Sequence, residues 1–142
     1  MKQNTPPFLN QPSSRYFSLL SGCLVQFLVG LLDLQKNHSS PFVQELIAFI
    51  TDHMTDISME LAATHFGYHK NYFPTIVKKR TNHTFLELVT DIRLQRACNL
   101  LLLTADSIEE ISASIGYRST ASFYSKFYAR FKMTPKEYRK RH

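Results

Sequence analysis

Two clusters of basic residues are the groups in this sequence best suited to bind an anion. The first cluster follows a segment that contains Glu60, and the second follows a segment that contains Glu109 and Glu110. Lysine and arginine side chains placed in this way suit phosphates, which contribute affinity without sequence information. The alternative is that these basic side chains only face solvent on the surfaces of helices. Against it, acidic residues precede basic residues in both segments. The clusters are Lys70, Lys78, Lys79 and Arg80, and then Arg118, Lys126, Arg130 and Lys132.

The two clusters belong to a repeat that predicts two helix-turn-helix units. Gly67-Tyr68 recurs as Gly116-Tyr117 and Phe73 recurs as Phe123, so the offset is 49 residues and then 50. In each copy a short helix ends at the glycine, which readily adopts a left-handed turn, and a second helix follows. In a helix-turn-helix the first helix supports the second, whose N-terminal side chains enter the major groove. The predicted units span about 58–80 and about 107–131.

The remaining pattern from residue 40 onward predicts helices only. Ser40-Pro41 indicates the start of a helix to about His53. Three capping boxes indicate further helix starts, and the first of them opens a long helix at about 85–103 between the two units. Since no segment shows sustained alternation, we expect an all-α fold with two helix-turn-helix subdomains joined by a long linker helix, plus an N-terminal apolar helix. The boxes are Thr84–Glu87, Ser107–Glu110 and Thr134–Glu137.

The first 40 residues differ in composition from the rest. Residues 1–15 are polar and rich in proline, which predicts disorder. Residues 16–34 predict a helix that is apolar almost all round and must be covered on more than one side, and 35–40 form a linker. We expect this helix to form a homodimer contact or to be the remnant of a sensor domain. Its uncharged stretch, Phe17 to Leu32, is shorter than the ~20 residues that cross a bilayer, so no membrane partner is expected.

Composition limits the class of protein. The chain has 142 residues, 44% of them hydrophobic, and a formal net charge of +6, which favours one domain with an appendage and a polyanionic partner. Cys23 and Cys98 are isolated, as in a reduced cytoplasmic protein. No glycine-rich phosphate loop, nucleophile elbow or carboxylate pair indicates an enzyme. His65 and His69 have helical spacing, but Gly67-Tyr68 interrupts the helix between them, so no metal or cofactor is expected.

A set of signature residues extends through both predicted units: Leu61-Ala62-Ala63, Gly67-Tyr68, Phe73, Val77-Lys78, Arg93, Ala97, Leu100-Leu101, Ile111, Gly116-Tyr117, Phe123, Phe127, Met133-Thr134-Pro135 and Tyr138-Arg139. With these residues, positions 41–142 resemble the DNA-binding domain of the AraC/XylS family of bacterial transcription regulators. The resemblance implies a sequence-specific regulator that inserts two recognition helices into successive major-groove segments, about one helical turn apart. It also implies double-stranded DNA and RNA polymerase as partners.

The resemblance assigns roles by position. Asn71 could pair with adenine and Ala121 could touch a thymine methyl group, although each could instead be a helix cap or a solvated residue. The aromatic and aliphatic residues of both helices (Tyr72, Phe73, Val77, Phe123 and Phe127) are expected in the core rather than stacked on bases. The base-facing candidates are His69, Lys70, Asn71, Thr75, Thr120, Ala121, Ser122 and Ser125. The phosphate candidates are Lys78, Lys79, Arg80, Arg118, Lys126 and Arg130, with Lys70 as a further one.

Three features depart from the family pattern. Pro74 would cost ~3 kcal/mol inside a helix, unless Asn71 is the N-cap and the first recognition helix starts late. Lys132 stands where the family favours glycine, and because a lysine at positive φ costs ~1–2 kcal/mol, we expect a remodelled turn. Forty preceding residues are too few for a sensor domain, so the chain is either a stand-alone regulator or a piece of a longer protein.

Pro74 also supports an alternative function, a protein-interaction module that keeps the fold without productive specific DNA binding. The fuller set of signature residues in the second helix-turn-helix argues against that alternative.

Overall fold

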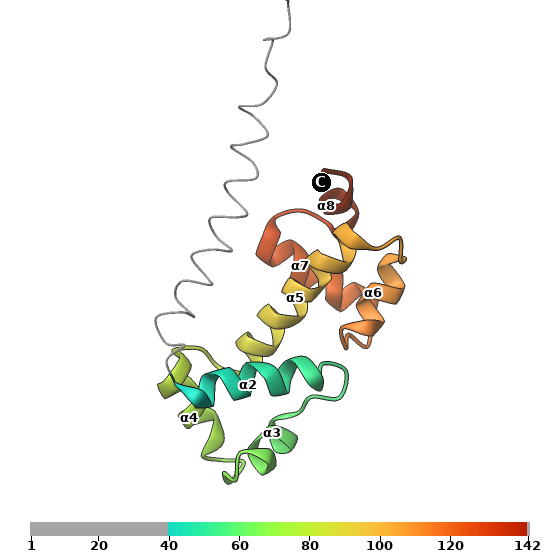
Figure 1. Cartoon of the computed structure of the whole chain (residues 1–142). Helices are drawn as coiled ribbons and strands as arrows, with labels where there is room; N and C mark the ends of the chain where they lie inside the picture. Colours follow the sequence, from blue (N-terminus) through green and yellow to red (C-terminus); the bar gives the residue numbers. More distant parts are fainter. Residues whose placement is uncertain (1–39, 142) are drawn as a thin grey trace, which may run out of the picture. The chain divides into compact units, whose positions relative to one another are not determined.

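The computed structural model describes residues 40–141, which lie within the second of two compact parts of the chain, Lys36–His142. The expected disorder at 1–15, the apolar helix at 16–34 and its homodimer contact lie outside the described residues. The described part contains helices and no strand, which confirms the all-α class (Figure 1). The helices are α2 (Pro41–Asp52), α3 (Met59–His65), α4 (Phe73–Thr81), α5 (Phe85–Leu103), α6 (Ile108–Ser114), α7 (Thr120–Phe131) and α8 (Pro135–Arg141).

Local hydrogen bonds explain where several of these helices begin. Thr84 caps α5: its N–H donates to Glu87 Oε2 over 2.7 Å, and its hydroxyl accepts from the Glu87 N–H over 3.2 Å. The same reciprocal pair forms between Ser107 and Glu110 at α6 and between Thr134 and Glu137 at α8. These bonds satisfy amides that the helix itself leaves unpaired. The three predicted capping boxes are therefore confirmed.

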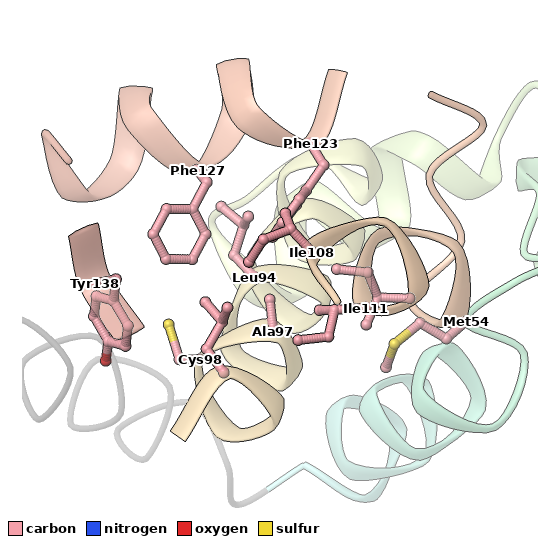
Figure 2. Close-up of a cluster of buried hydrophobic side chains, with 11 residues drawn as sticks. Met54, Leu94, Ala97, Cys98, Ile108, Ile111, Phe123, Phe127 and Tyr138 are labelled. Carbon is pink, nitrogen blue, oxygen red and sulfur yellow. The ribbon is translucent and has the colours of Figure 1, made fainter. Parts of the chain in front are cut away.

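The linker helix α5 carries two apolar stripes, each of which belongs to a different hydrophobic core. Phe85, Leu88 and Val89 pack in the core around α2, α3 and α4. The later residues pack in the core around α6, α7 and α8 (Figure 2). The first stripe ends at Ile92 and the second begins at Leu94, two residues later. Because an α-helix turns roughly 100° per residue, the second stripe is rotated by about 200° around the axis of α5 relative to the first. The two cores therefore lie on opposite sides of α5. The later stripe consists of Leu94, Ala97, Cys98 and Leu101.

Residues with positive φ end several helices. Gly67 follows α3 with φ 69° and Gly116 follows α6 with φ 85°, as predicted. Asn82 ends α4 with φ 60°, a left-handed conformation that asparagine tolerates. The remodelled turn expected at Lys132 is wrong, because Lys132 takes the left-handed conformation itself with φ 57°. Its N–H donates to Tyr128 O over 2.8 Å, which closes the last turn of α7.

The C-terminal helix is tied to the end of the linker helix. Arg139 of α8 donates from Nε to Leu101 O over 3.1 Å and from Nη2 to Asp106 O over 2.7 Å. The carbonyl of Leu101 belongs to the last turn of α5, where no next turn can pair with it. Arg139 therefore closes the helix end and holds α8 against the second core. Within residues 40–141, no helix is both long and apolar enough to cross a membrane.

Candidate nucleic-acid interface

The helix expected to carry the first recognition surface starts later than its counterpart in the second copy. The Tyr72 and Phe73 N–H groups both donate to His69 O, over 2.9 and 3.0 Å, which closes a separate turn before α4. Pro74 has no N–H, so it cannot donate to the Lys70 carbonyl and continue that turn into the helix. The late start is confirmed, but Asn71 as its N-cap is wrong, because Tyr72 occupies that position and Pro74 lies in the first helical turn.

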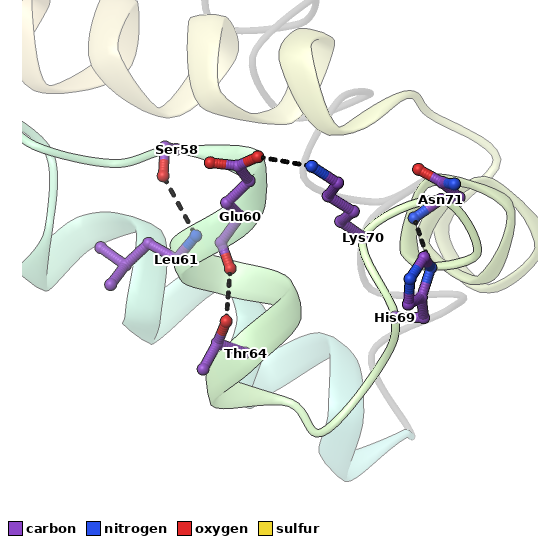
Figure 3. A network of polar contacts seen from close by, with 7 residues as sticks. All are labelled: Ser58, Glu60, Leu61, Thr64, His69, Lys70 and Asn71. Atoms are coloured by element: carbon purple, nitrogen blue, oxygen red, sulfur yellow. Dashed lines mark hydrogen bonds and ion pairs between the residues drawn. The ribbon is translucent and has the colours of Figure 1, made fainter.

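Three of the four residues expected to face bases in the first unit lie in this turn. His69, Lys70 and Asn71 are exposed there, whereas Thr75 is exposed on α4 itself. Lys70 Nζ lies 3.1 Å from Glu60 Oε1 on α3, and the Asn71 N–H donates to His69 Nδ1 over 3.3 Å (Figure 3). The turn is therefore ordered by its own polar groups, and Lys70 already has an acidic partner.

The four candidates of the second unit lie in the first half of α7. Ser119 is the N-cap: its hydroxyl accepts from the Ser122 N–H over 3.2 Å and lies 3.0 Å from Ser122 Oγ. Thr120 is half-buried, while Ala121, Ser122 and Ser125 are exposed. Sequence reasoning missed the capping role of Ser119, which the spacing Ser-x-x-Ser before an apolar run could have indicated. Ser122 would reach DNA with its hydroxyl already bonded to this cap.

The aromatic residues of the two helices divide into core and surface. Phe73, Val77, Phe123 and Phe127 are fully buried, as expected. Tyr72 is 55% exposed, so its assignment to the core is wrong. The reason is the late start of α4, which leaves Tyr72 at the helix boundary instead of on its apolar face. Tyr72 is thus an exposed aromatic residue beside the candidate base-facing turn.

The basic candidates are all exposed on or next to the second helix of each unit. Arg80 also lies over the Phe42 ring, 4.7 Å from its centroid, and Arg130 Nε lies 3.9 Å from Asp91 Oδ1. Exposed ion pairs of this kind are worth about 0–1 kcal/mol, so a phosphate could displace Asp91. The residues are Lys78, Lys79 and Arg80 in the last turn of α4, Arg118 before α7, and Lys126 and Arg130 on α7.

A half-buried polar junction connects the two units through the linker helix. Arg93 of α5 donates from Nε and Nη2 to Met54 O, over 3.2 and 2.7 Å. Its guanidinium lies 5.6 Å from the centroid of the Tyr117 ring. Burial lowers the pKa of Arg93 and raises the pKa of Tyr117. Sequence reasoning used Arg93 only as a family signature and did not predict these contacts.

Comparison with known proteins places this arrangement in a family. Residues 62–141, which include α4 to α8, match the family described as a helix-turn-helix domain. The chain belongs to the AraC/XylS-type helix-turn-helix family. The match covers more than half of the chain and includes both second helices, α4 and α7.

A regulator of known name is similar in sequence to this AraC/XylS-type chain. The melibiose operon regulatory protein of Escherichia coli strain K12 is 29% identical over 106 residues. That similarity covers 74% of this chain and 35% of the regulator, so the chain spans about a third of that protein's length.

Two solved structures are similar to the chain. The C-terminal domain of AraT, a response regulator from Geobacillus stearothermophilus, has a TM-score of 0.67 at 28% identity, covering 72% of this chain and 87% of that one. A transcriptional regulator of Chromobacterium violaceum, described as containing an AraC-type DNA-binding domain, has a TM-score of 0.66 at 25% identity, covering 72% and 93%.

Proposed function

We propose that this chain is a sequence-specific DNA-binding transcription regulator. In this proposal α4 and α7 insert into successive major-groove segments of double-stranded DNA, about one helical turn apart. The observation that carries it is the repetition of one layout on a single linker helix. In both units an exposed polar stretch, which precedes α4 in the first unit and opens α7 in the second, is followed by exposed basic residues.

The roles proposed for individual residues follow from their positions. Exposed polar groups at the start of a recognition helix are placed to reach base edges, and basic groups further along or beside the helix are placed to reach phosphates. The base-facing residues are His69, Lys70, Asn71, Thr75, Thr120, Ala121, Ser122 and Ser125. The phosphate-contacting residues are Lys78, Lys79, Arg80, Arg118, Lys126 and Arg130.

The two units are proposed to contribute unequally to sequence specificity. The start of α7 presents Ala121 and Ser122 from a regular, capped helix. The corresponding residues of the first unit lie in a separate turn, and Lys70 is paired with Glu60. The late start of α4 supports a first unit in which Thr75 makes the main base contact. The basic residues of that unit would then contact the phosphate backbone.

The proposal extends to the cellular role of the chain. The relative in Escherichia coli is named as the regulator of an operon, which supports a regulatory role in the cytoplasm. RNA polymerase is the further partner that such a role would require. The second candidate function is the interaction module without specific DNA binding, and only the irregular start of α4 favours it.

Selection of bound duplexes from a random DNA pool tests the proposal. We expect an asymmetric site of ~20 bp with two submotifs about 10 bp apart, and the submotif read by α7 should show the stronger base preference. The affinity of the selected duplex is then measured against salt concentration. If binding depends steeply on salt and no sequence is enriched, the chain binds DNA only through its positive charge, and the proposal of sequence-specific binding is wrong. If the chain binds no duplex, the interaction module is favoured.

A further inference from the structure

Met54, two residues after the end of α2, belongs to two structural environments at once. Met54 comes after the first-unit helix α2, yet its side chain is 9% exposed and packs in the second core with Ile111 and Phe123 (Figure 2). Its carbonyl oxygen accepts both hydrogen bonds from Arg93. Met54 therefore connects the first unit to the core of the second.

Arg93 has the charge and the geometry to hold this connection. It lies in α5 next to Ile92, the residue that packs against both cores, so it stands where the two apolar stripes meet. Two donors of one planar guanidinium converge on one carbonyl oxygen, which restricts both the distance and the direction of approach. Tyr117 covers the guanidinium from the second unit, and Tyr117 Oη has no hydrogen-bond partner among the described residues.

The turn between α6 and α7, which contains Gly116, packs closely against the Met54 carbonyl oxygen. A Cβ atom at Gly116 would overlap with Met54 O and would lie 2.7 Å from Arg93 Nη2. Only a glycine therefore allows the α6–α7 turn to approach this closely. At Gly67, the corresponding glycine of the first unit, a Cβ atom would meet nothing within 4 Å. The close approach is a property of the second turn and not of the repeat.

The junction lies next to the segments that orient both recognition helices. Met54 is four residues before Ser58, the N-cap of α3. Gly116 is three residues before Ser119, the N-cap of α7. A contact that holds Met54 against Gly116 therefore fixes the position of α3, the supporting helix of the first unit, relative to α7, the recognition helix of the second.

We propose that Arg93 is a positioning residue that sets the spacing and rotation at which the two recognition helices meet DNA. It acts through the Met54 carbonyl and the Gly116 turn and touches no DNA itself. This inference rests on the proposed function, because spacing has meaning only if both helices read one duplex. One base pair of added spacing rotates a half-site by about 35° around the duplex and moves it about 3.4 Å. A rigid junction should reject that displacement.

The test compares binding across duplexes whose two submotifs are separated by the selected spacing or by one or two base pairs more or fewer. Arg93→Met removes both donors, and Arg93→Lys keeps the charge with a different geometry. Arg96→Met is the matched control, since Arg96 is exposed on the same helix and its loss changes net charge equally. Affinity is measured by fluorescence anisotropy, and folding is measured by circular dichroism on the same samples.

We expect the wild-type chain and Arg96→Met to lose affinity about tenfold at one base pair from the optimum, comparable to one mismatched base pair. Arg93→Met should bind all spacings within about threefold of one another, with Arg93→Lys between the two. A folded Arg93→Met variant with the wild-type spacing profile would overturn the inference. Loss of helical structure in both Arg93 variants would also overturn it, because Arg93 would then be required for folding. A wild-type chain with no spacing optimum would overturn the proposed function and the inference with it.

Discussion

Lys70 Nζ lies 3.1 Å from Glu60 Oε1, so the turn expected to reach DNA is bonded to the helix that supports it (Figure 3). Both side chains are more than half exposed, and such a pair adds little to folding stability. Its consequence is for binding, because a phosphate or a base edge must compete with Glu60 for the lysine. The pair therefore lowers the positive charge that the first unit offers to DNA.

Replacing Glu60 tests this competition. Glu60→Gln should raise affinity for the selected duplex by about two- to fivefold at low salt, with a smaller gain at high salt. The free energy of unfolding should change by less than about 0.5 kcal/mol. Glu109→Gln, at the corresponding position of the second unit, removes an equal charge that has no lysine partner among residues 40–141. Equal gains from both variants would show a general field effect and contradict a role for the pair.

The phosphate contacts proposed for the second unit predict a change in salt dependence. Lys126→Ala should reduce the slope of log affinity against log salt concentration by about 0.9, because one phosphate contact is lost. Arg118→Ala should do the same, and thermal stability should be unchanged since both residues are exposed. Lys136→Ala on α8 is the control and should leave the slope as it is. An unaltered slope in the first two variants would favour the interaction module.

The two turn glycines should respond very differently to one added methyl group. Gly67→Ala imposes only the strain of positive φ, about 1–2 kcal/mol. Gly116→Ala adds an overlap with Met54 O and should destabilise the fold by about 2–5 kcal/mol. Chemical denaturation of both variants measures the difference. Similar losses at the two positions would mean that the Gly116 turn does not approach Met54 as described.

Lys132 offers a stabilising substitution. It holds φ 57°, where a side chain is strained, so Lys132→Gly should raise the free energy of unfolding by about 0.5–1 kcal/mol. Asn82 holds φ 60° at the end of α4, but asparagine tolerates this conformation. Asn82→Gly should therefore have a smaller effect. Thermal melts of the two variants beside the wild type provide the measurement, and destabilisation by Lys132→Gly would be the contrary result.

The capping boxes predict a loss of stability in acid. Hydrogen bonds from the Thr84 backbone and side chain lower the pKa of Glu87 from its ordinary 4.5, and Ser107 and Thr134 do the same for Glu110 and Glu137. Because these pKa values are lower in the folded chain, the stabilisation is complete above the ordinary value and is lost as pH falls through the lowered one.

Denaturation midpoints measured from about pH 6 downward check the sign of this effect. Glu110→Gln should flatten the fall in stability below the ordinary value. Glu109→Gln removes a neighbouring carboxylate outside the capping box and is the matched control. An equally steep fall in the Glu110→Gln variant would contradict the contribution of that box.

Local sequence patterns predicted much of the fold. The capping residues Thr84, Ser107 and Thr134 act on amides three residues away, so their effect can be read without knowing the tertiary structure. Gly67 and Gly116 end helices for the same local reason. Pro74 predicted a delayed α4 because a missing N–H is also a local property. The position of the N-cap was missed, since the His69 carbonyl, and not the Asn71 side chain, closes the preceding turn.

The sequence by itself determined most of the helices from residue 40 onward and their order, because a helix depends on residues within a turn or two of one another. It also determined the repeat and the family, because the same residue types recur at fixed spacings. Tertiary structure alone decided that Tyr72 is exposed, that Lys70 pairs with Glu60 and that Arg93 binds Met54. The last contact joins residues 39 positions apart through a backbone carbonyl, which every residue possesses and which therefore leaves no mark in the sequence. How the two units are held against each other is decided by that contact and by the stripe that changes sides along α5.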